Sequence, residues 1–179
     1  MRKVILSSFV SVDGVAETPE KWQEPYWSDE LEAYSYDLLH SVDALLLGRV
    51  TYEIFAEAWP AITDESGFAE RMNTLPKYVA TTTLTELSWN ATPVRSVAEL
   101  ERLKQGPGGD LLIYGSTGLV RNLIRSGLID DYRIWVHPVI VGAGARMFIA
   151  DGPGAGLKLV AATVFDTGVV IQRYRPANG

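Results

Sequence analysis

The sequence predicts an α/β fold in which a mostly parallel sheet is covered by helices on both faces and ends in antiparallel strands. Short apolar segments alternate with helical patterns as far as Gly127, which is typical of parallel sheets with crossover helices on both faces. From Asp130 onward only strand-like segments remain, and 166–168 forms a hairpin turn. Ligands of such sheets bind at the carboxyl ends of the parallel strands.

The first half of the chain predicts strands that alternate with helices. Residues 3–10 are apolar and β-branched enough for a buried strand, and a turn over 11–14 follows it. Ser28 is the expected N-cap of a helix over 29–40, because acidic residues fill the first turn of that helix. The remaining elements of this half are a strand over 43–47, helices over 50–57 and 65–73, and a strand over 77–81.

The second half begins with a short edge segment near Trp89 and Val94. Ser96 caps the next helix, which runs to Lys104, because Glu99 lies three positions later and completes a capping box. The remaining elements are a strand over 111–114, an amphipathic helix over 119–126 and strands over 132–141, 157–165 and 169–175.

Composition narrows the class of protein. The 179 residues predict a single domain over 1–179, and hydrophobic and charged shares of 47% and 21% are those of a globular chain. The net charge of -6 and the lack of basic runs argue against nucleic-acid and membrane partners. With no Cys and only two His, we expect no metal site. No apolar stretch approaches the ~20 residues of a membrane span, so we expect a cytoplasmic protein.

Three predicted strand ends carry residues suited to anions. They are Gly48-Arg49-Val50-Thr51, Thr81-Thr82-Thr83 and Gly115-Ser116-Thr117-Gly118. Two of them open a helix, whose free N–H groups favour phosphate, while glycines allow close approach and hydroxyls and Arg donate further hydrogen bonds. Each also has a plain structural interpretation, including an exposed Arg49–Glu53 pair at i,i+4. Together the three indicate one anion-binding edge.

A second cluster surrounds the first strand end. Asp13 is a candidate general acid or base, although an Asx turn explains it equally well. The loop after it carries Trp22 and Trp27, which are suited to stacking on a flat heterocycle, or else to packing beneath the loop. Glu32 on the first helix is within reach of the same cleft. His137 is interpreted as a hydrogen-bonded core residue.

The segments LLLGRVTYE, VATTT and LLIYGSTGLV resemble the cofactor-binding elements of dihydrofolate reductases. SFVSVDGV, IYGSTGLVRNLI and IDDYRIWVHPVIVGAGARMF are typical of the related reductase domain of bacterial riboflavin biosynthesis. The resemblance implies a three-layer αβα sandwich that binds NADPH and is commonly a homodimer. Ser116 departs from the family pattern, in which a second glycine follows the first. The deaminase domain that usually accompanies the riboflavin enzymes has no counterpart in these 179 residues.

The resemblance also implies roles by position. Gly48, Arg49 and Thr51 would meet the phosphates of NADPH. Thr82 and Thr83 would lie at the ribose 2′-phosphate. The pyrophosphate would be held by Gly115, Ser116, Thr117, Gly118 and the N–H of Leu119, and the substrate by Trp22, Trp27 and Glu32.

The predicted function is NADPH-dependent reduction of a small heterocycle. The candidates are a pterin, a pyrimidine or a relative, as in dihydrofolate reductase or in 5-amino-6-(5-phosphoribosylamino)uracil reductase. Hydride would pass from the nicotinamide C4 to a substrate near the turn at 11–14, and the proton would come from Asp13 or an ordered water. The alternative is a non-catalytic protein that binds or senses NADPH on the same fold.

Overall fold

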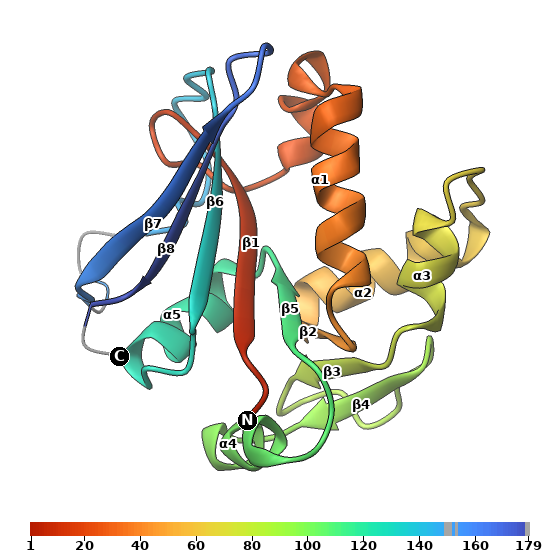
Figure 1. Cartoon of the computed structure of the whole chain (residues 1–179). Coiled ribbons are helices and arrows are strands. Elements are labelled where there is room, and N and C mark those ends of the chain that lie inside the picture. Colours follow the sequence, from red (N-terminus) through yellow and green to blue (C-terminus); the bar gives the residue numbers. More distant parts are fainter. Residues whose placement is uncertain (149–151, 153, 178–179) are drawn as a thin grey trace.

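The computed structural model describes residues 1–148, 152 and 154–177. Its described residues form one mixed sheet of eight strands in the order β4-β3-β2-β5-β1-β6-β8-β7 (Figure 1). Neighbouring strands are parallel from β4 to β6, and β8 is antiparallel to both β6 and β7. The strands are β1 Val4–Ser11, β2 Ala44–Gly48, β3 Lys77–Ala80, β4 Ala91–Val94, β5 Leu111–Tyr114, β6 Asp131–His137, β7 Leu157–Val164 and β8 Val170–Pro176. The predicted mixed sheet with antiparallel C-terminal strands is confirmed.

Helices cover both faces of the sheet, which confirms the three layers. Along β2, Leu45 and Leu47 point toward one helical layer and Leu46 toward the other, as the two-residue period of a strand requires. The first layer contains α1 Asp29–His40, α2 Arg49–Ala58 and α3 Phe68–Thr74, and the second contains α4 Val97–Gln105 and α5 Thr117–Arg125. Short 3-10 turns are η1 Pro19–Lys21, η2 Glu24–Tyr26 and η3 Trp59–Ala61.

Three element boundaries differ from the predicted ones by two residues or more. Strand β6 ends at His137 rather than at 141, because Pro138 supplies no N–H to the ladder and the chain turns there, with the Val139 N–H donating back to the His137 carbonyl at 2.8 Å. Helix α3 begins at Phe68, since the preceding residues form a loop around Asp64. Helix α5 begins at Thr117, two residues early.

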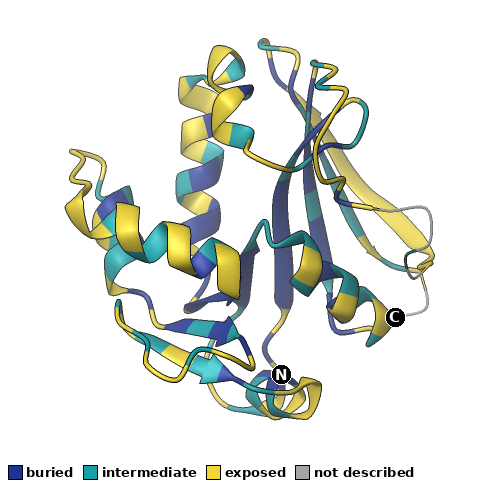
Figure 2. Ribbon diagram, turned by 180° about the vertical axis from the view of Figure 1, so that it is seen from behind, coloured by how far each residue is buried: buried dark blue, intermediate teal, exposed yellow. Residues whose placement is uncertain are grey.

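The edge strand β7 is exposed along its whole length (Figure 2). It pairs with β8 alone among the described strands. Leu159, Val160 and Val164 are 54%, 43% and 73% exposed. An apolar edge strand of this kind is an open template for pairing with another chain.

Among the described residues, no helix is both long and apolar enough to cross a membrane.

Candidate functional site

Ser116 joins two of the three predicted strand ends. Its hydroxyl accepts the Gly48 N–H at 2.9 Å and lies 2.6 Å from the Thr51 hydroxyl, so that the β2–α2 and β5–α5 turns are in contact. A Cβ at Gly48 would lie 2.8 Å from the Ser116 Oγ, which explains why a glycine stands there. Ser116, at the position where the resemblance implies a second glycine, therefore connects the two turns.

The starts of α2 and α5 differ from those of the other long helices. Ser28 caps α1 and Ser96 caps α4, each accepting a backbone N–H. No described side chain caps α2 or α5. The first N–H groups of both helices are therefore left for solvent or a ligand, at the end where the helix dipole favours an anion. This is the geometry that the sequence predicts for a phosphate site.

The predicted residues of the β5–α5 turn lie around this contact. Gly115 and Ser116 both have positive φ values, of 58° and 63°, which turn the chain sharply from the strand into the helix. Thr117 and Gly118 follow as the first helical residues, and the Leu119 side chain lies against Gly48. The N–H groups of Thr117, Gly118 and Leu119 are thus the first three of α5.

Arg49 pairs with Glu53, as the plain interpretation of the sequence expects. Its guanidinium lies 2.9 Å from the Glu53 carboxylate, and both side chains are about half exposed, at 47% and 43%. An exposed pair of this type contributes on the order of 0.3–0.5 kcal/mol to stability. Arg49 is therefore held at the mouth of the turn by a weak contact that a phosphate can replace.

The third strand end carries an arginine that sequence reasoning missed. Thr82 and Thr83 are exposed, while the buried Thr81 hydroxyl accepts the Thr83 N–H at 3.2 Å. Arg95 donates to the Thr81 carbonyl at 3.0 Å from the end of the neighbouring strand β4. Arg95 directly follows a predicted edge segment in the sequence. Because parallel strands end at the same edge of a sheet, this position could have placed Arg95 near Thr82 and Thr83.

The Asp13 carboxylate is engaged in contacts with both its own turn and the loop after β6. It accepts the Ser11 hydroxyl at 2.6 Å and the N–H groups of Val141 and Gly142 at 3.1 and 2.9 Å, with Arg146 at 3.8 Å. The hydrogen bond from Ser11, followed by the one from Val141, lowers the pKa of Asp13 to about 2. The group is ionised at neutral pH, which argues against a proton donor. The Asx-turn interpretation is not confirmed either, because the Val15 N–H donates to the Ser11 hydroxyl and the Asp13 carboxylate instead connects the turn at 11–14 to the loop at 141–142.

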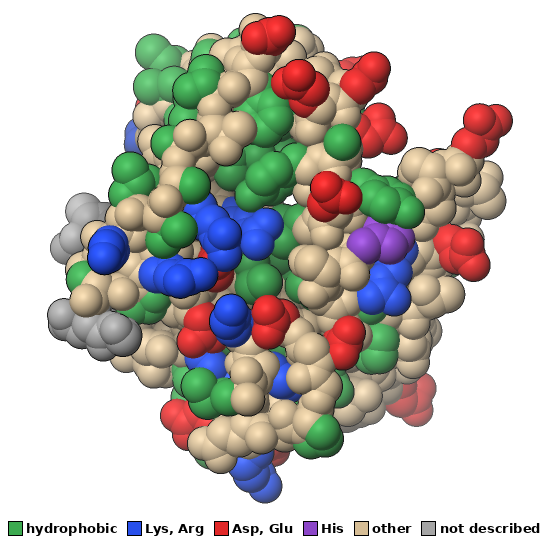
Figure 3. Space-filling view, viewed as in Figure 1, with side chains coloured by type: hydrophobic (Ala, Val, Ile, Leu, Met, Phe, Trp, Pro, Cys, Tyr) green, Lys and Arg blue, Asp and Glu red, His purple; other side chains and the backbone are tan. Residues whose placement is uncertain are grey.

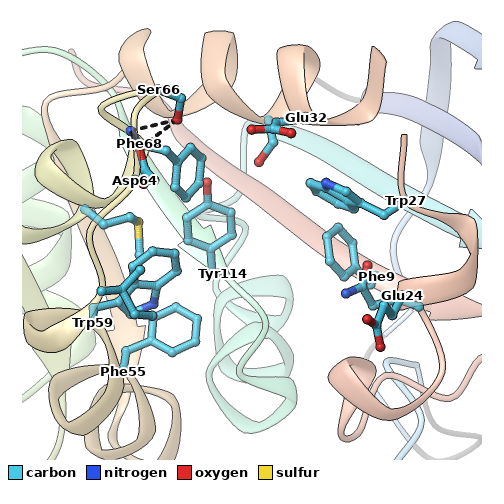
Figure 4. A pocket seen from close by; sticks show the side chains of 14 residues that line it. Phe9, Glu24, Trp27, Glu32, Phe55, Trp59, Asp64, Ser66, Phe68 and Tyr114 are labelled. Atoms are coloured by element: carbon cyan, nitrogen blue, oxygen red, sulfur yellow. Dashed lines mark hydrogen bonds between the residues drawn. The ribbon is translucent and has the colours of Figure 1, made fainter. Parts of the chain in front are cut away.

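A cleft of about 540 Å³ lies between α1 and the α2–α3 region (Figure 4). Trp27 and Glu32 line it, as predicted. Trp22 does not, because it is buried, donates from Nε1 to the Glu17 carbonyl and packs edge-on against His137 with ring centroids 5.3 Å apart. Sequence reasoning missed most of the lining, which includes Phe9, Gln23, Glu24, Ser35, Phe55, Trp59, Asp64, Ser66, Phe68 and Tyr114.

Tyr114 lies at the end of β5, directly before Gly115, and Figure 4 places its ring between the two sides of the cleft. Its hydroxyl has no hydrogen-bond partner of regular geometry among the described residues. Burial raises the pKa of Tyr114, and the neighbouring Ser35 hydroxyl offsets only part of that rise. The phenol is protonated at neutral pH and has a hydrogen bond to give.

His137 is buried, as predicted for a core histidine, and its Nδ1 lies 3.0 Å from the Trp135 carbonyl. Burial lowers its pKa. Within the described ranges, no three His, Asp or Glu side chains are grouped as a metal site would require.

The chain is similar to proteins of known sequence over nearly its full length. The uncharacterized protein YyaP of Bacillus subtilis (strain 168) is 29% identical over 174 residues, which is 94% of this chain and 92% of YyaP. The uncharacterized protein YwjB of the same organism is 28% identical over 150 residues, which is 82% of this chain and 83% of YwjB.

Solved structures share the fold. A putative riboflavin biosynthesis protein from Shewanella sp. PV-4 superposes with a TM-score of 0.73 at 17% identity, over 98% of this chain and 99% of that one. Dihydrofolate reductase from Enterococcus faecalis, complexed with NADP(H), gives 0.67 at 15% identity, over 98% and 96%. The deaminase/5-amino-6-(5-phosphoribosylamino)uracil reductase of Thermotoga maritima gives 0.67 at 16% identity, over 98% of this chain and 57% of that one.

A family model, the RibD C-terminal domain, matches residues 2–171. It covers the uncapped starts of α2 and α5, the cleft and the antiparallel strand β8 up to Ile171. The chain belongs to the RibD C-terminal domain family.

Proposed function

We propose that the protein is an NADPH-dependent reductase of a small heterocycle such as a pterin or a pyrimidine, acting as one domain over 1–179. The observation that supports this most is the pair of uncapped helix starts at α2 and α5, joined through Ser116 and followed at the same sheet edge by an aromatic cleft. NADPH has its reactive ring at one end, its pyrophosphate in the middle and its 2′-phosphate toward the other end, and this chain offers a flat-ring site and an anion site in sequence along one edge.

Residues at the edge divide the cofactor between them. The first N–H groups of α2, the Thr51 hydroxyl and the turn 115–119 would hold the pyrophosphate. Gly48, whose own N–H is donated to Ser116, would let it approach closely. Thr82 and Thr83, with Arg49 on one side and Arg95 on the other, would hold the 2′-phosphate. Bound NADPH supplies a hydride from C4, which breaks one C–H bond there and forms another at an electron-poor carbon of the substrate.

The chain's own residues would orient the substrate and manage the proton. Trp27 and Phe9 would stack on the ring and exclude water from it. Tyr114 would hold its proton at Oη against the substrate heteroatom that takes up one proton as the adjacent carbon takes the hydride, with solvent as the final source. One two-electron reduction then balances one NADPH oxidised to NADP⁺.

Two measurements test the proposal. The fluorescence of NADPH in a titration reports binding, and absorbance at 340 nm reports oxidation in the presence of dihydrofolate, the riboflavin-pathway intermediate or simple quinoids. We expect micromolar binding and turnover of at least one substrate class. Binding without any turnover would favour the alternative of a non-catalytic NADPH sensor, and absence of binding would refute both.

The 2′-phosphate assignment has its own test. Arg49→Ala and Arg95→Ala should each weaken NADPH binding by about ten- to a hundredfold, since a hydrogen bond to a charged group contributes about 1.5–3 kcal/mol. NADH, which lacks the 2′-phosphate, should lose much less. An equal loss for both cofactors would exclude the residue from that role.

We also propose that two copies associate through β7. Burial of its apolar side chains, with Leu159, Val160 and Val164 all more than 40% exposed in the single chain, would remove the open edge. Light scattering should give a dimer mass for the parent and for Ile54→Lys, an exposed apolar position on α2. Leu159→Lys should give a monomer; a dimer of Leu159→Lys would refute this interface.

A further inference from the structure

The walls of the cleft are aromatic on two sides. Phe9 and Trp27 meet edge to face at 6.1 Å between ring centroids, and Phe55 and Trp59 do so at 6.2 Å. Figure 4 places the first pair on one side of the cleft and the second on the other, with Tyr114 between them. A cavity bounded in this way fits a flat ring, because rings offer large contact areas to such walls.

All ionisable groups of the cleft other than Tyr114 are acids. Glu24, Glu32 and Asp64 line it, and the described lining residues include no Lys, Arg or His. Asp64 accepts N–H groups from the start of α3 and the Ser66 hydroxyl; the Ala69 N–H, at 2.6 Å, contributes most to lowering its pKa. The carboxylates of Glu24 and Glu32 make no hydrogen bond or ion pair with the described part of the chain, so their oxygens are left for a ligand.

Two arginines of β6 and β8 on the same side of the sheet as α1 are already engaged with acidic and hydroxyl groups. Arg173 makes a bidentate contact with the buried Asp131, and Arg133 lies 3.5 Å from the same carboxylate and donates to the Tyr34 hydroxyl at 3.3 Å. Neither lines the cleft. In Figure 3, basic side chains gather over the side where β6 and β8 lie, and acidic ones gather around α1. A phosphate on a ring bound in the cleft would face carboxylates.

From these walls and charges we infer that the cleft binds a phosphate-free, planar ring, neutral or cationic, whose amino or imino N–H groups donate to Glu32 and Glu24. The inference rests on the proposed function, because the bound ring is a substrate only if the protein is a reductase. It also distinguishes this chain from a reductase that acts on a phosphoribosyl substrate. The carboxylates accept N–H groups, and the Tyr114 hydroxyl donates to one ring nitrogen or oxygen. The cleft thereby selects by charge as well as by shape.

A charge series of one ring size tests the inference. Benzamidine, benzamide and benzoate carry charges of about +1, 0 and −1 at neutral pH, and ligand-observed NMR titration against the protein gives their affinities. We expect affinity to fall in that order, by roughly tenfold from first to last, and the range to narrow at high salt. Cytidine should likewise bind more tightly than cytidine 5′-monophosphate, from which it differs only by the phosphate.

Variants on one helix locate the effect. Glu32→Gln should weaken benzamidine by about three- to fivefold and leave benzamide unchanged, which is the size expected for a solvent-exposed charge pair. Glu30→Gln, two residues earlier on α1 and outside the cleft, is the matched control and should alter neither. The inference would be overturned if benzoate bound as tightly as benzamidine, or if cytidine 5′-monophosphate bound as tightly as cytidine. It would also be overturned if Glu32→Gln bound benzamidine as tightly as the parent, or if benzamidine did not bind.

Failure of this inference is distinguishable from failure of the proposed function. The titrations are run with and without NADPH, whose own binding is followed separately by its fluorescence. If NADPH binds and is oxidised while the ligand series shows no charge order, the reductase stands and the substrate class is wrong. If the charge order is present and depends on Glu32 while NADPH does not bind, the cleft is assigned correctly and the reductase fails.

Discussion

Gly48→Ala tests whether the two phosphate turns are packed as one unit. The backbone of Gly48 has φ -77° and ψ 159°, which alanine adopts freely, so any cost is steric. The added methyl would lie 2.8 Å from the Ser116 Oγ and 3.0 Å from its Cβ. Rotation of the hydroxyl relieves the first contact but not the second. Overpacking of this kind costs about 1–3 kcal/mol, and relief by backbone movement sacrifices the Gly48 N–H bond to Ser116.

A second substitution makes the reasoning refutable. Ser116→Gly removes the obstructing atoms; it loses a hydrogen bond of about 1 kcal/mol but releases a residue at φ 63°, where glycine is favoured by about 1–2 kcal/mol. Gly48→Ala should therefore cost little in the Ser116→Gly background. Urea unfolding followed by tryptophan fluorescence measures the free energy of unfolding of the parent, the two single variants and the double variant. A cost of Gly48→Ala below about 0.5 kcal/mol, or one that persists in the double variant, would refute the account.

Three further outcomes follow from single residues. Burial lowers the pKa of Lys77 to about 8, so the folded state binds fewer protons than the unfolded state between about pH 8 and 10.5. The free energy of unfolding should therefore rise across that window, by about 1 kcal/mol after solvent screening. Urea unfolding at pH 7.5 and 9.5 should show this rise in the parent and not in Lys77→Met. Asp13→Asn should lower the free energy of unfolding at pH 7, and the variant should lose less of that free energy than the parent as the pH falls from about 4 to 2. Its turnover rate should stay within about twofold of the parent's. A much lower rate in a folded variant would restore Asp13 as the proton donor. Tyr114→Phe should keep or raise stability by about 1 kcal/mol, since its hydroxyl is buried without a partner, and should lower the 340 nm rate by about 10²-fold; an unchanged rate would remove Tyr114 from the reaction.

Local patterns predicted most of the fold. The serine caps of α1 and α4 and the apolar strands β1, β2 and β5 follow from interactions within a few residues, which a sequence displays directly. The early end of β6 was also readable, since Pro138 cannot extend a ladder. The long apolar run across it outweighed that signal.

Contacts between distant segments were beyond local patterns. Gly48 and Ser116 are 68 residues apart, and their contact depends on β2 and β5 being neighbours in the sheet. The cleft walls Trp59 and Phe68 come from a 3-10 turn and a helix start with no recognisable motif. Arg49 shows that a local contact can also be undecided. Its sequence position allowed either an ion pair with Glu53 or a phosphate contact, and the sequence could not choose between them.

The uncapped starts of α2 and α5 also have a dynamic consequence. Amides without a cap open to solvent more readily than those held by Ser28 or Ser96, so hydrogen exchange should be fastest at these two helix starts. Because Ser116 ties the turns together, an anion that closes one should slow exchange at the other. Ligand binding would then raise the free energy of unfolding in proportion to the logarithm of the free ligand concentration. Without the ligand, the two helix starts would open more independently of the rest of the fold.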